Sequence, residues 1–461
     1  MSFNSIAFLF FLPTIWVIYW SVKSSLRLQN LILLISSYVF YSWFEWKLSL
    51  LIFAISLISY YTGLRLSRGN KWIHCISIPL VLLVLGVFKY YNFFVDNINA
   101  VFLSLGYSLD IPSLHIILPI GISFYTFQAI SYIMDIKRKL ITPTSDMLSF
   151  LTYMSFFPQL VAGPIERAKD FLPQVLKQRR LETEMFSDGC RQVLWGFFKK
   201  LVVADNCAIV VNDIWSHYEL YNGTTLIVGT ILFTFQIYSD FSGYSDIAIG
   251  TAKMFGFRLS ANFSYPYFSE TISDFWRRWH ITLLSWFRDY VYIPLGGNRC
   301  SFSKVARNTF VVFGLSGLWH GASWTFVMWG LYHALLFVPS LFLKKIGVKI
   351  NTPRILSIIL IFILVDIGWI FFRAPSIGDA FGYLCAINNF GPIQLGKAAL
   401  AYCLLLYVTE CFSLRKEYPL KIERQGVWAN CSVLRWTVYY VLTMSVIFLR
   451  GDVQSFIYFQ F

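Results

Sequence analysis

Two histidines lie in a long segment of the chain that carries no charged side chain. Residues 308–343 contain no Lys, Arg, Asp or Glu, yet they include His320 in GLWHGAS and His333 in GLYHALL. An unbroken helix of this length would reach roughly 54 Å, well beyond the ~30 Å hydrocarbon core of a bilayer. The segment is therefore expected to turn inside a membrane, near Gly317 and Gly321, where a break is easiest.

The position of His320 at this predicted break indicates a functional site. Irregular backbone at membrane depth is tolerated only inside protein or beside water, and an ionisable group held there marks a site by default. His333 lies on a regular helical pattern between aromatic and aliphatic neighbours. For His333 we expect a structural role instead, as a hydrogen-bonding partner of a neighbouring helix.

A second candidate constellation is the stretch SDFWRRWHITLLSWFRDYVYIPLGGNR, which begins at Ser273. Its apolar residues recur at three- and four-residue intervals, which predicts an amphipathic helix at the membrane interface or tucked into the protein. Trp276, Trp279 and His280 share the apolar face. The basic residues fall mostly elsewhere; they are Arg277, Arg278 and Arg288. These arginines either contact anionic lipids or bind the phosphates of a cytoplasmic ligand, and the pattern does not separate the two interpretations.

The composition places the chain in a bilayer. Hydrophobic residues make up 57% and charged residues only 13%, against about 25% charged in soluble domains. The net charge of +14 fits contact with anionic membrane lipid, and we expect no nucleic-acid partner. The eight cysteines are scattered without CxxC pairs, which predicts neither disulfides nor a metal site. No linker or repeat divides residues 1–461, so we expect a single domain.

Apolar runs predict about eleven membrane spans. Their approximate ranges are 5–22, 28–44, 48–64, 72–91, 115–134, 193–215, 224–240, a broken pair within 308–343, 355–372, 397–413 and 433–449. Basic connections alternate with acidic ones in the first part of the chain, and the positive-inside rule then puts the N-terminus outside the cytoplasm. The long connections 137–192 and 257–307 are predicted to face the cytoplasm, the first as short interfacial helices.

Four sequence blocks resemble the membrane-bound O-acyltransferase family. They are LPIGISFYTFQAISYIMDIKR from Leu118, FFPQLVAGPIER from Phe156, the block from Asp240 to Arg299 that contains DFSGYSDIAIG and FWRRWHITLLSWFRDY, and GLWHGASWTFVMWGLYHALL from Gly317. They occur in order through residues 118–336. More narrowly they resemble the bacterial alginate O-acetylases and the peptidoglycan or exopolysaccharide O-acetyltransferases, with teichoic acid D-alanyltransferases as more distant relatives.

This resemblance implies an all-α polytopic protein, with a ring of about eleven transmembrane helices around a central funnel for an acyl donor. It matches His320 to the family's invariant histidine and His280 to a residue on the donor side, with Trp276 and Trp279 beside it. It implies no bound cofactor, acetyl-CoA or an acyl-carrier thioester as donor, a polysaccharide acceptor, a periplasmic esterase-like acetyltransferase as partner, and the bacterial inner membrane as location.

The chemistry of acyl transfer agrees with these residues. A hydroxyl that attacks a thioester must lose its proton, and a neutral imidazole such as that of His320 can take it near neutral pH. No GxSxG nucleophile elbow is present, so direct attack by the acceptor hydroxyl is expected. The developing oxyanion needs donors, for which His280, tryptophan side chains and the amides near Gly321 are all candidates.

Two alternatives remain open from the sequence. One is an acyltransferase whose acceptor is a lipid, a protein or teichoic acid, since acceptor choice depends on the shape of a cavity. The other is a proton-coupled transporter, in which the histidines and several acids form an ion path; these acids are Asp135, Asp240, Asp246 and Asp366.

Overall fold

The computed structural model describes residues 1–43, 45–109, 111–114, 118–161, 163–348, 352–422, 431–452 and 454–457. Within these ranges the regular structure is helical, without a β-strand. The chain forms two compact units. The first contains residues 1–182, 255–259 and 321–323, and the second contains residues 183–254, 260–320 and 324–461. The single domain and the ring of helices around a funnel stay predictions.

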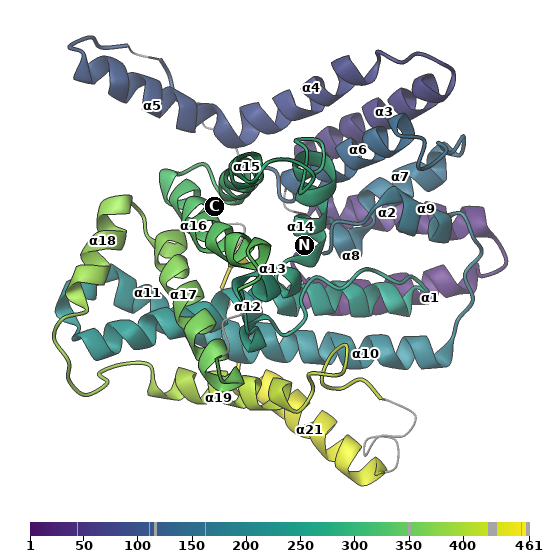
Figure 1. The fold of residues 1–461 in the computed structure, drawn as a ribbon. Coiled ribbons are helices and arrows are strands. Elements are labelled where there is room, and N and C mark those ends of the chain that lie inside the picture. The colour runs from purple at the N-terminus through teal and green to yellow at the C-terminus, as the bar shows by residue number, and fades with distance from the viewer. Residues whose placement is uncertain are drawn as a thin grey trace. The chain divides into compact units, whose positions relative to one another are not determined.

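The first unit is built from ten helices among its described residues. They are α1 (Ile6–Ser21), α2 (Leu26–Ser42), α3 (Trp46–Ser67), α4 (His74–Leu85), η1 (Gly86–Tyr90), α5 (Tyr91–Ser104), α6 (Ile122–Lys137), α7 (Met147–Ser155), α8 (Phe157–Leu160) and α9 (Ala168–Val175). Helix α4 packs on α6 and α3, whereas α5 extends away from the other helices of this unit (Figure 1). The helices α7, α8 and α9 confirm the short helices predicted within residues 137–192.

A buried polar junction joins the helices of the first unit. The side chain of Asn30 on α2 donates to Ser149 Oγ of α7 at 3.0 Å and to the carbonyl of Val175 at the end of α9. Arg179 donates to Asn30 Oδ1 at 2.7 Å and to the hydroxyl of Tyr19 on α1 at 2.8 Å. Because buried polar groups are costly unless paired, this junction specifies how four helices meet.

The second unit carries both predicted catalytic histidines. Its described helices are α10 (Thr183–Phe197), η2 (Phe198–Ala204), α11 (Asp205–Ser216), η3 (Tyr218–Leu220), α12 (Gly223–Met254), η4 (Pro266–Phe268), α13 (Ile272–Arg278), α14 (Ile281–Phe287), η5 (Arg288–Tyr292), α15 (Phe302–His320), α16 (Trp324–Lys345), α17 (Arg354–Arg373), α18 (Ile377–Ala386), α19 (Lys397–Cys411) and α21 (Ser432–Phe448). The long helix α12 is almost wholly buried and packs along α10, η2 and α11 (Figure 1).

Glycines bring α10 and α12 into backbone contact. A Cβ atom on Gly189 would lie 2.5 Å from the carbonyl oxygen of Gly250, and one on Gly196 would lie 2.7 Å from that of Gly243. The two pairs are spaced seven residues apart on each helix, so they recur on the same face. Small residues of this kind let helices approach closely in a membrane, where van der Waals packing drives association.

Five described helices are long and apolar enough to cross a membrane. They are Trp46–Ser67, the continuous run His74–Ser104, Gly223–Met254, Trp324–Lys345 and Arg354–Arg373; shorter apolar helices are Ile6–Ser21 and Ser432–Phe448. The structure thus supports a multi-pass membrane protein, but it does not confirm the count of eleven. The span predicted at 72–91 is longer than expected, because its helix continues to Ser104.

The predicted break between the two histidines is confirmed. Helix α15 ends at His320 and α16 begins at Trp324. The two helices pack closely, since a Cβ atom on Gly317 would lie 2.2 Å from the carbonyl oxygen of Phe326. A Cβ atom on Gly330 would lie equally close to that of Phe313. The depth of the turn in a membrane stays a prediction.

Candidate active site

His320 ends helix α15 inside a shell of aromatic rings. Its side chain is buried, and its ring centroid lies 4.9 Å from that of Trp319, 5.0 Å from that of Trp329 and 5.3 Å from that of Phe372. All three rings stand edge-on or nearly so to the imidazole. These contacts come from α15, α16 and α17, so the packing of three helices fixes the position of this histidine.

His280 lies at a sharp break in the chain. A single amphipathic helix was expected around it, and this expectation is wrong: α13 ends at Arg278 and α14 begins at Ile281. Trp279 is extended, whereas His280 adopts a left-handed backbone conformation with φ of 44°. Such a conformation is unfavourable for a residue with a Cβ atom, and it is often found at functional sites. Helical periodicity could not reveal the break, because the apolar spacing continues across it.

Burial and one polar contact determine the protonation state of the His280 imidazole. Its Nδ1 atom lies 3.0 Å from Oδ1 of Asn262, and Phe241 contacts the ring edge-on at 4.7 Å. His280 lies outside the candidate membrane-spanning helices, and burial lowers the pKa of its imidazole to about 3. Since desolvation disfavours the charged form, the ring is neutral at physiological pH.

Trp319 connects the two predicted catalytic histidines. Its ring centroid lies 5.6 Å from that of His280, and Trp319 directly precedes His320 in the chain. The structure therefore brings both predicted histidines to one tryptophan. Trp276 and Trp279, predicted to lie beside them, are also buried. The ring of Trp279 is tilted against that of Trp369 with centroids 4.9 Å apart, and the ring of Trp276 lies 5.7 Å from that of Trp329. The result is a continuous aromatic cluster around the histidines.

His333 belongs to the same cluster, although not as predicted. We expected it to bond a neighbouring helix, but among the described residues neither of its ring nitrogens has a hydrogen-bond partner. Instead its ring meets Trp276 at 4.9 Å with an interplanar angle of 90°, and Trp329 at 5.1 Å. An N–H directed at an aromatic ring is a weak hydrogen bond, and this packing offers that alternative to a polar partner.

The three arginines of the predicted donor site have acidic neighbours, and two of them, Arg277 and Arg288, are largely exposed, whereas Arg278 is partly buried. Arg277 and Arg278 both reach Asp274, at 3.7 and 2.9 Å, and Arg288 pairs with Asp289 at 2.7 Å. The side chains of Arg277 and Arg288 are 73% and 63% exposed, so a ligand could reach them without displacing packed residues. Nothing in these contacts decides between lipid and donor phosphate.

Sequence reasoning missed a polar cavity next to His280. The cavity encloses about 30 Å³, enough for one or two water molecules, and lies among η2, α12 and the loops before α13 and after α19. Its lining includes Asn262, the Lys199–Asp246 ion pair of 2.6 Å, and Glu410, which accepts from Tyr238 at 2.8 Å. The adjacent lysines in the apolar sequence FFKKLVVA were the available signal, since buried charges in a span are rarely incidental.

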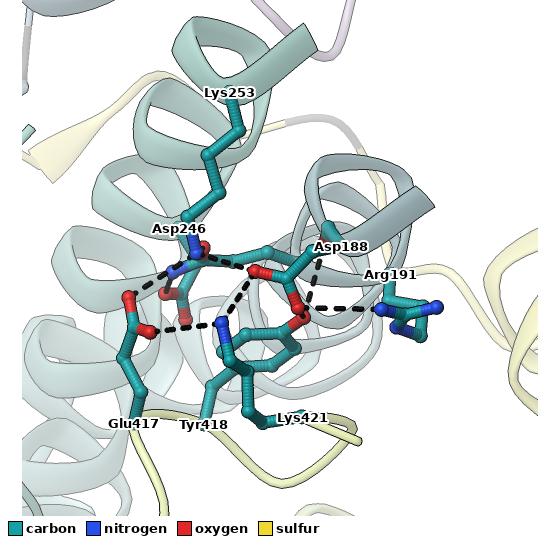
Figure 2. Close-up of polar contacts among 8 residues, drawn as sticks. Asp188, Arg191, Asp246, Lys253, Glu417, Tyr418 and Lys421 are labelled. Carbon is teal, nitrogen blue, oxygen red and sulfur yellow. Dashed lines mark hydrogen bonds and ion pairs between the residues drawn. The ribbon is translucent and has the colours of Figure 1, made fainter. Parts of the chain in front are cut away.

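Beside this cavity lies a second charged cluster, which is centred on Asp188. Asp188 on α10 accepts from Lys253 of α12 at 2.8 Å, from Lys421 at 2.7 Å and from Tyr418 at 2.6 Å (Figure 2). Burial opposes ionisation of this carboxyl, but hydrogen bonds from the two lysines and Tyr418 outweigh that effect and hold its pKa well below the ordinary value. The cluster joins the loop after α19 to the α10–α12 pair.

The acids considered for an ion path in the second unit all have polar partners in the structure. Asp246 pairs with Lys199, whereas Asp240 pairs with Lys200 at 2.8 Å. Asp366 accepts instead from threonine hydroxyls of α12. Each carboxylate is held by its own neighbours, as expected of groups that join helices.

These features define a multi-pass helical membrane protein with two buried histidines at a shared tryptophan. The profile of the membrane-bound O-acyltransferase family matches residues 39–373, and the chain belongs to this family. It is therefore an O-acyltransferase, which confirms the predicted enzyme class and argues against the transporter alternative.

Several relatives carry more specific names. The chain is 39% identical to a probable alginate O-acetylase of Pseudomonas aeruginosa, over 93% of this chain and 85% of that protein. It is 30% identical to a peptidoglycan O-acetyltransferase of Helicobacter pylori, over 100% of this chain and 98% of that protein. It is 27% identical to a teichoic acid D-alanyltransferase of Bacillus subtilis, over 70% of this chain and 82% of that protein.

Proposed function

We propose that the protein moves an acetyl group from a cytoplasmic thioester toward a hydroxyl of an extracytoplasmic polysaccharide, with His320 as the base. The observation that carries the proposal is the burial of His320 beside Trp319, whose ring also contacts His280, in a member of this acyltransferase family. The relatives named for acetylation of alginate and peptidoglycan support the choice of acetyl group and polymer.

The reaction needs no covalent enzyme intermediate. The acceptor oxygen attacks the thioester carbonyl and forms the C–O bond while the imidazole of His320 takes the hydroxyl proton. The C–S bond then breaks, and the departing thiolate receives the proton from the imidazolium. The shell of Trp319, Trp329 and Phe372 excludes bulk water, which limits hydrolysis of the donor.

The donor is proposed to be acetyl-CoA or an acyl-carrier thioester. Either one carries phosphate, which guanidinium groups bind bidentately. Arg277, Arg278 and Arg288 offer such groups on the exposed side of the two short helices that flank His280. Trp276 directly precedes Arg277, and Trp279 lies between Arg278 and His280 in the chain. Both tryptophans are buried, and they would border the path of the acyl group.

We propose that a periplasmic esterase-like acetyltransferase receives the acetyl group and passes it to the polymer. The site is packed with aromatic side chains, and the cavity beside it has room for only one or two water molecules, so a bulky hydrated polymer has little room to enter. Purified enzyme with labelled donor and oligosaccharide provides the test. Efficient acetylation of the sugar without a partner would refute the relay, whereas transfer only after addition of the partner would support it.

The proposed location is the bacterial inner membrane, with the N-terminus in the periplasm and residues 137–192 and 257–307 in the cytoplasm. The alternation of basic and acidic connections supports this orientation. In a variant without other cysteines, Ser145→Cys and the native Cys300 should react with a membrane-impermeant maleimide only after the cytoplasmic side is opened. Labelling of intact spheroplasts would reverse the topology.

The experiment that tests the function is transfer of labelled acetyl groups in proteoliposomes. Acetyl-CoA supplied on one side and oligosaccharide with partner on the other should give labelled ester only when both are present. Parallel assays with lipid and with teichoic acid test the second candidate acceptors, which the resemblance to a D-alanyltransferase keeps in consideration. Labelling of those acceptors alone would replace the polysaccharide proposal.

A further inference from the structure

Asn262 contacts His280 and the first turn of the following helix at the same time. The residue is buried, with 1% of its surface exposed, and lies in the loop after α12. Its backbone carbonyl accepts from the N–H of Ile281 at 2.9 Å, and its side-chain oxygen accepts from the N–H of Thr282 at 3.4 Å. Asn262 therefore satisfies the first two amides of α14, which His280, as the preceding residue, does not cap with its own side chain.

These contacts determine which end of the Asn262 amide faces His280. The backbone N–H of Thr282 can only donate, and the Thr282 hydroxyl also lies 2.9 Å from the same atom. An amide nitrogen in that position would oppose a donor, whereas an oxygen accepts from it. On the opposite end, Nδ2 of Asn262 lies 3.4 Å from Oγ of Ser245, which can accept. The atom beside His280 is therefore the oxygen.

An oxygen at this position determines the tautomer of the neighbouring imidazole. The side-chain oxygen of Asn262 has no proton to give, so a hydrogen bond over the 3.0 Å to Nδ1 of His280 requires that Nδ1 carry the proton. In a neutral ring the lone pair then resides on Nε2. The left-handed backbone at His280 and the edge-on contact of Phe241 restrict how the ring can turn.

We propose that Asn262 is a positioning residue for acyl transfer, which holds His280 in the Nδ1–H tautomer so that Nε2 acts as a hydrogen-bond acceptor at the reaction centre. This inference rests on the proposed function of His280. It also removes His280 from the candidate oxyanion donors, because a neutral histidine in this tautomer has no N–H on Nε2 to offer an oxyanion. The oxyanion donors are then to be sought among tryptophan N–H groups or backbone amides.

The direct test measures the tautomer rather than activity. Protein with 15N-labelled histidine is placed in nanodiscs, and the His280 signals are identified by their loss in His280→Ala. Nitrogen shifts separate a protonated from an unprotonated ring nitrogen. We expect a protonated Nδ1 in the wild type, and a mixed or reversed tautomer in Asn262→Leu. A protonated Nε2 in the neutral wild-type ring, or an unchanged tautomer in Asn262→Leu, would overturn the proposal.

Kinetics separate positioning from simple support of the fold. Asn262→Leu should lower kcat at least tenfold with little change in donor KM, whereas Asn262→Asp keeps an oxygen acceptor and should retain most of the activity at neutral pH. In Asn262→Asp the added carboxylate favours the imidazolium, so the acid limb of the pH–rate profile should move to higher pH. An equal loss in both variants, with no shift of the profile, would indicate a structural role.

Two further variants control for loss of a helix cap. Thr271→Ala removes the comparable cap of α13, where the hydroxyl accepts from the N–H of Asp274 at 3.1 Å, and it should lower stability without changing the His280 tautomer. Asn262→Leu in a His280→Ala background should cause no further loss of kcat, since the residue acts through the missing ring. If His280→Ala and His320→Ala both keep full activity while the tautomer is as expected, the proposed function fails and the tautomer assignment stands.

Discussion

The ring of His280 lies 5.6 Å from that of Trp319, the residue that directly precedes His320. Two histidines separated by forty positions in sequence thus meet the same indole. Their places are set by different means. His320 is held by the packing of α15, α16 and α17, whereas His280 is held by a backbone break and a hydrogen bond to Asn262. Changes to the two supports should therefore have separable effects.

The first prediction concerns His320 itself. His320→Ala should reduce acetyl transfer by roughly 10²- to 10⁴-fold, the usual contribution of one general base, while the protein stays folded in the membrane. His280→Ala should impair transfer strongly as well. Labelled acetyl transfer in proteoliposomes measures both, and thermal unfolding followed by tryptophan fluorescence monitors the fold. His217→Ala changes an exposed histidine at the end of α11 and should have no effect. Wild-type turnover by folded His320→Ala would contradict the assignment.

The second prediction concerns the contact that supports His320. Gly317→Ala would place its Cβ atom 2.2 Å from the carbonyl oxygen of Phe326, so α15 and α16 must separate. We expect a loss of stability of about 1–3 kcal/mol, as for overpacking elsewhere, together with lower activity because His320 lies one turn further along. Unfolding midpoints in detergent and transfer rates measure the two effects.

Gly314→Ala is the matched control for this change. It adds the same methyl group one turn earlier on the same helix, where its nearest neighbour would be Leu331 at 3.9 Å, an ordinary contact. This variant should be neutral or slightly stabilising, because alanine favours a helix over glycine. Equal losses in Gly314→Ala and Gly317→Ala would show that close packing of α15 and α16 is not what positions the histidine.

The sequence was informative about His320 and less so about His280. The uncharged segment 308–343 exceeds the membrane thickness, and this simple excess of length predicted the break between α15 and α16. The break at His280 left no such trace, since the apolar period of three to four continues across it. At this break Asn262, from the loop after α12, bonds to the His280 ring and to the first turn of α14, and helical periodicity does not record such a tertiary contact.

The ion pairs of the second unit could not be predicted from the sequence either. Lys199 and Asp246 are 47 positions apart, and no local rule pairs them; their ion pair depends on the register of η2 against α12, which the glycine contacts of α10 and α12 help to fix. The sequence could have flagged the adjacent lysines as unusual in an apolar run. It could not have told which acids would neutralise them.

The third prediction tests the arginines as phosphate ligands. Replacing Arg277, Arg278 and Arg288 with Gln should raise the donor KM and weaken its dependence on salt, because screening acts on the lost charges. Arg354→Gln is the control, since Arg354 is similarly exposed and paired with Glu270 at 2.9 Å but was not assigned to the donor. If KM and its salt response are unchanged while membrane insertion falls, these arginines anchor the protein to lipid instead.

The last prediction uses the pH dependence of Asp188. Its pKa is held below the ordinary value of 3.8, because hydrogen bonds from Lys253, Lys421 and Tyr418 outweigh the effect of burial. A depressed pKa in the folded state contributes stability above the unfolded value, and this contribution is lost as the pH falls through the folded pKa. We therefore expect Asp188→Asn to be destabilised by up to about 3–5 kcal/mol at pH 7, since Lys253 and Lys421 lose the buried carboxylate and keep the more exposed Glu417 as their shared acidic partner.

The difference between wild type and Asp188→Asn should narrow below about pH 4, by up to roughly 1.4 kcal/mol for each pH unit. Above pH 5 the difference should be constant, because the carboxyl is then ionised in both the folded and the unfolded state. Unfolding in detergent at pH 7, 5, 4 and 3 measures it, with Asp452→Asn as an exposed control. If the difference in unfolding free energy between wild type and Asp188→Asn is unchanged from pH 7 to pH 3, the charge of Asp188 is not what the lysines require. The cluster would then join α10, α12 and the loop after α19 by packing alone.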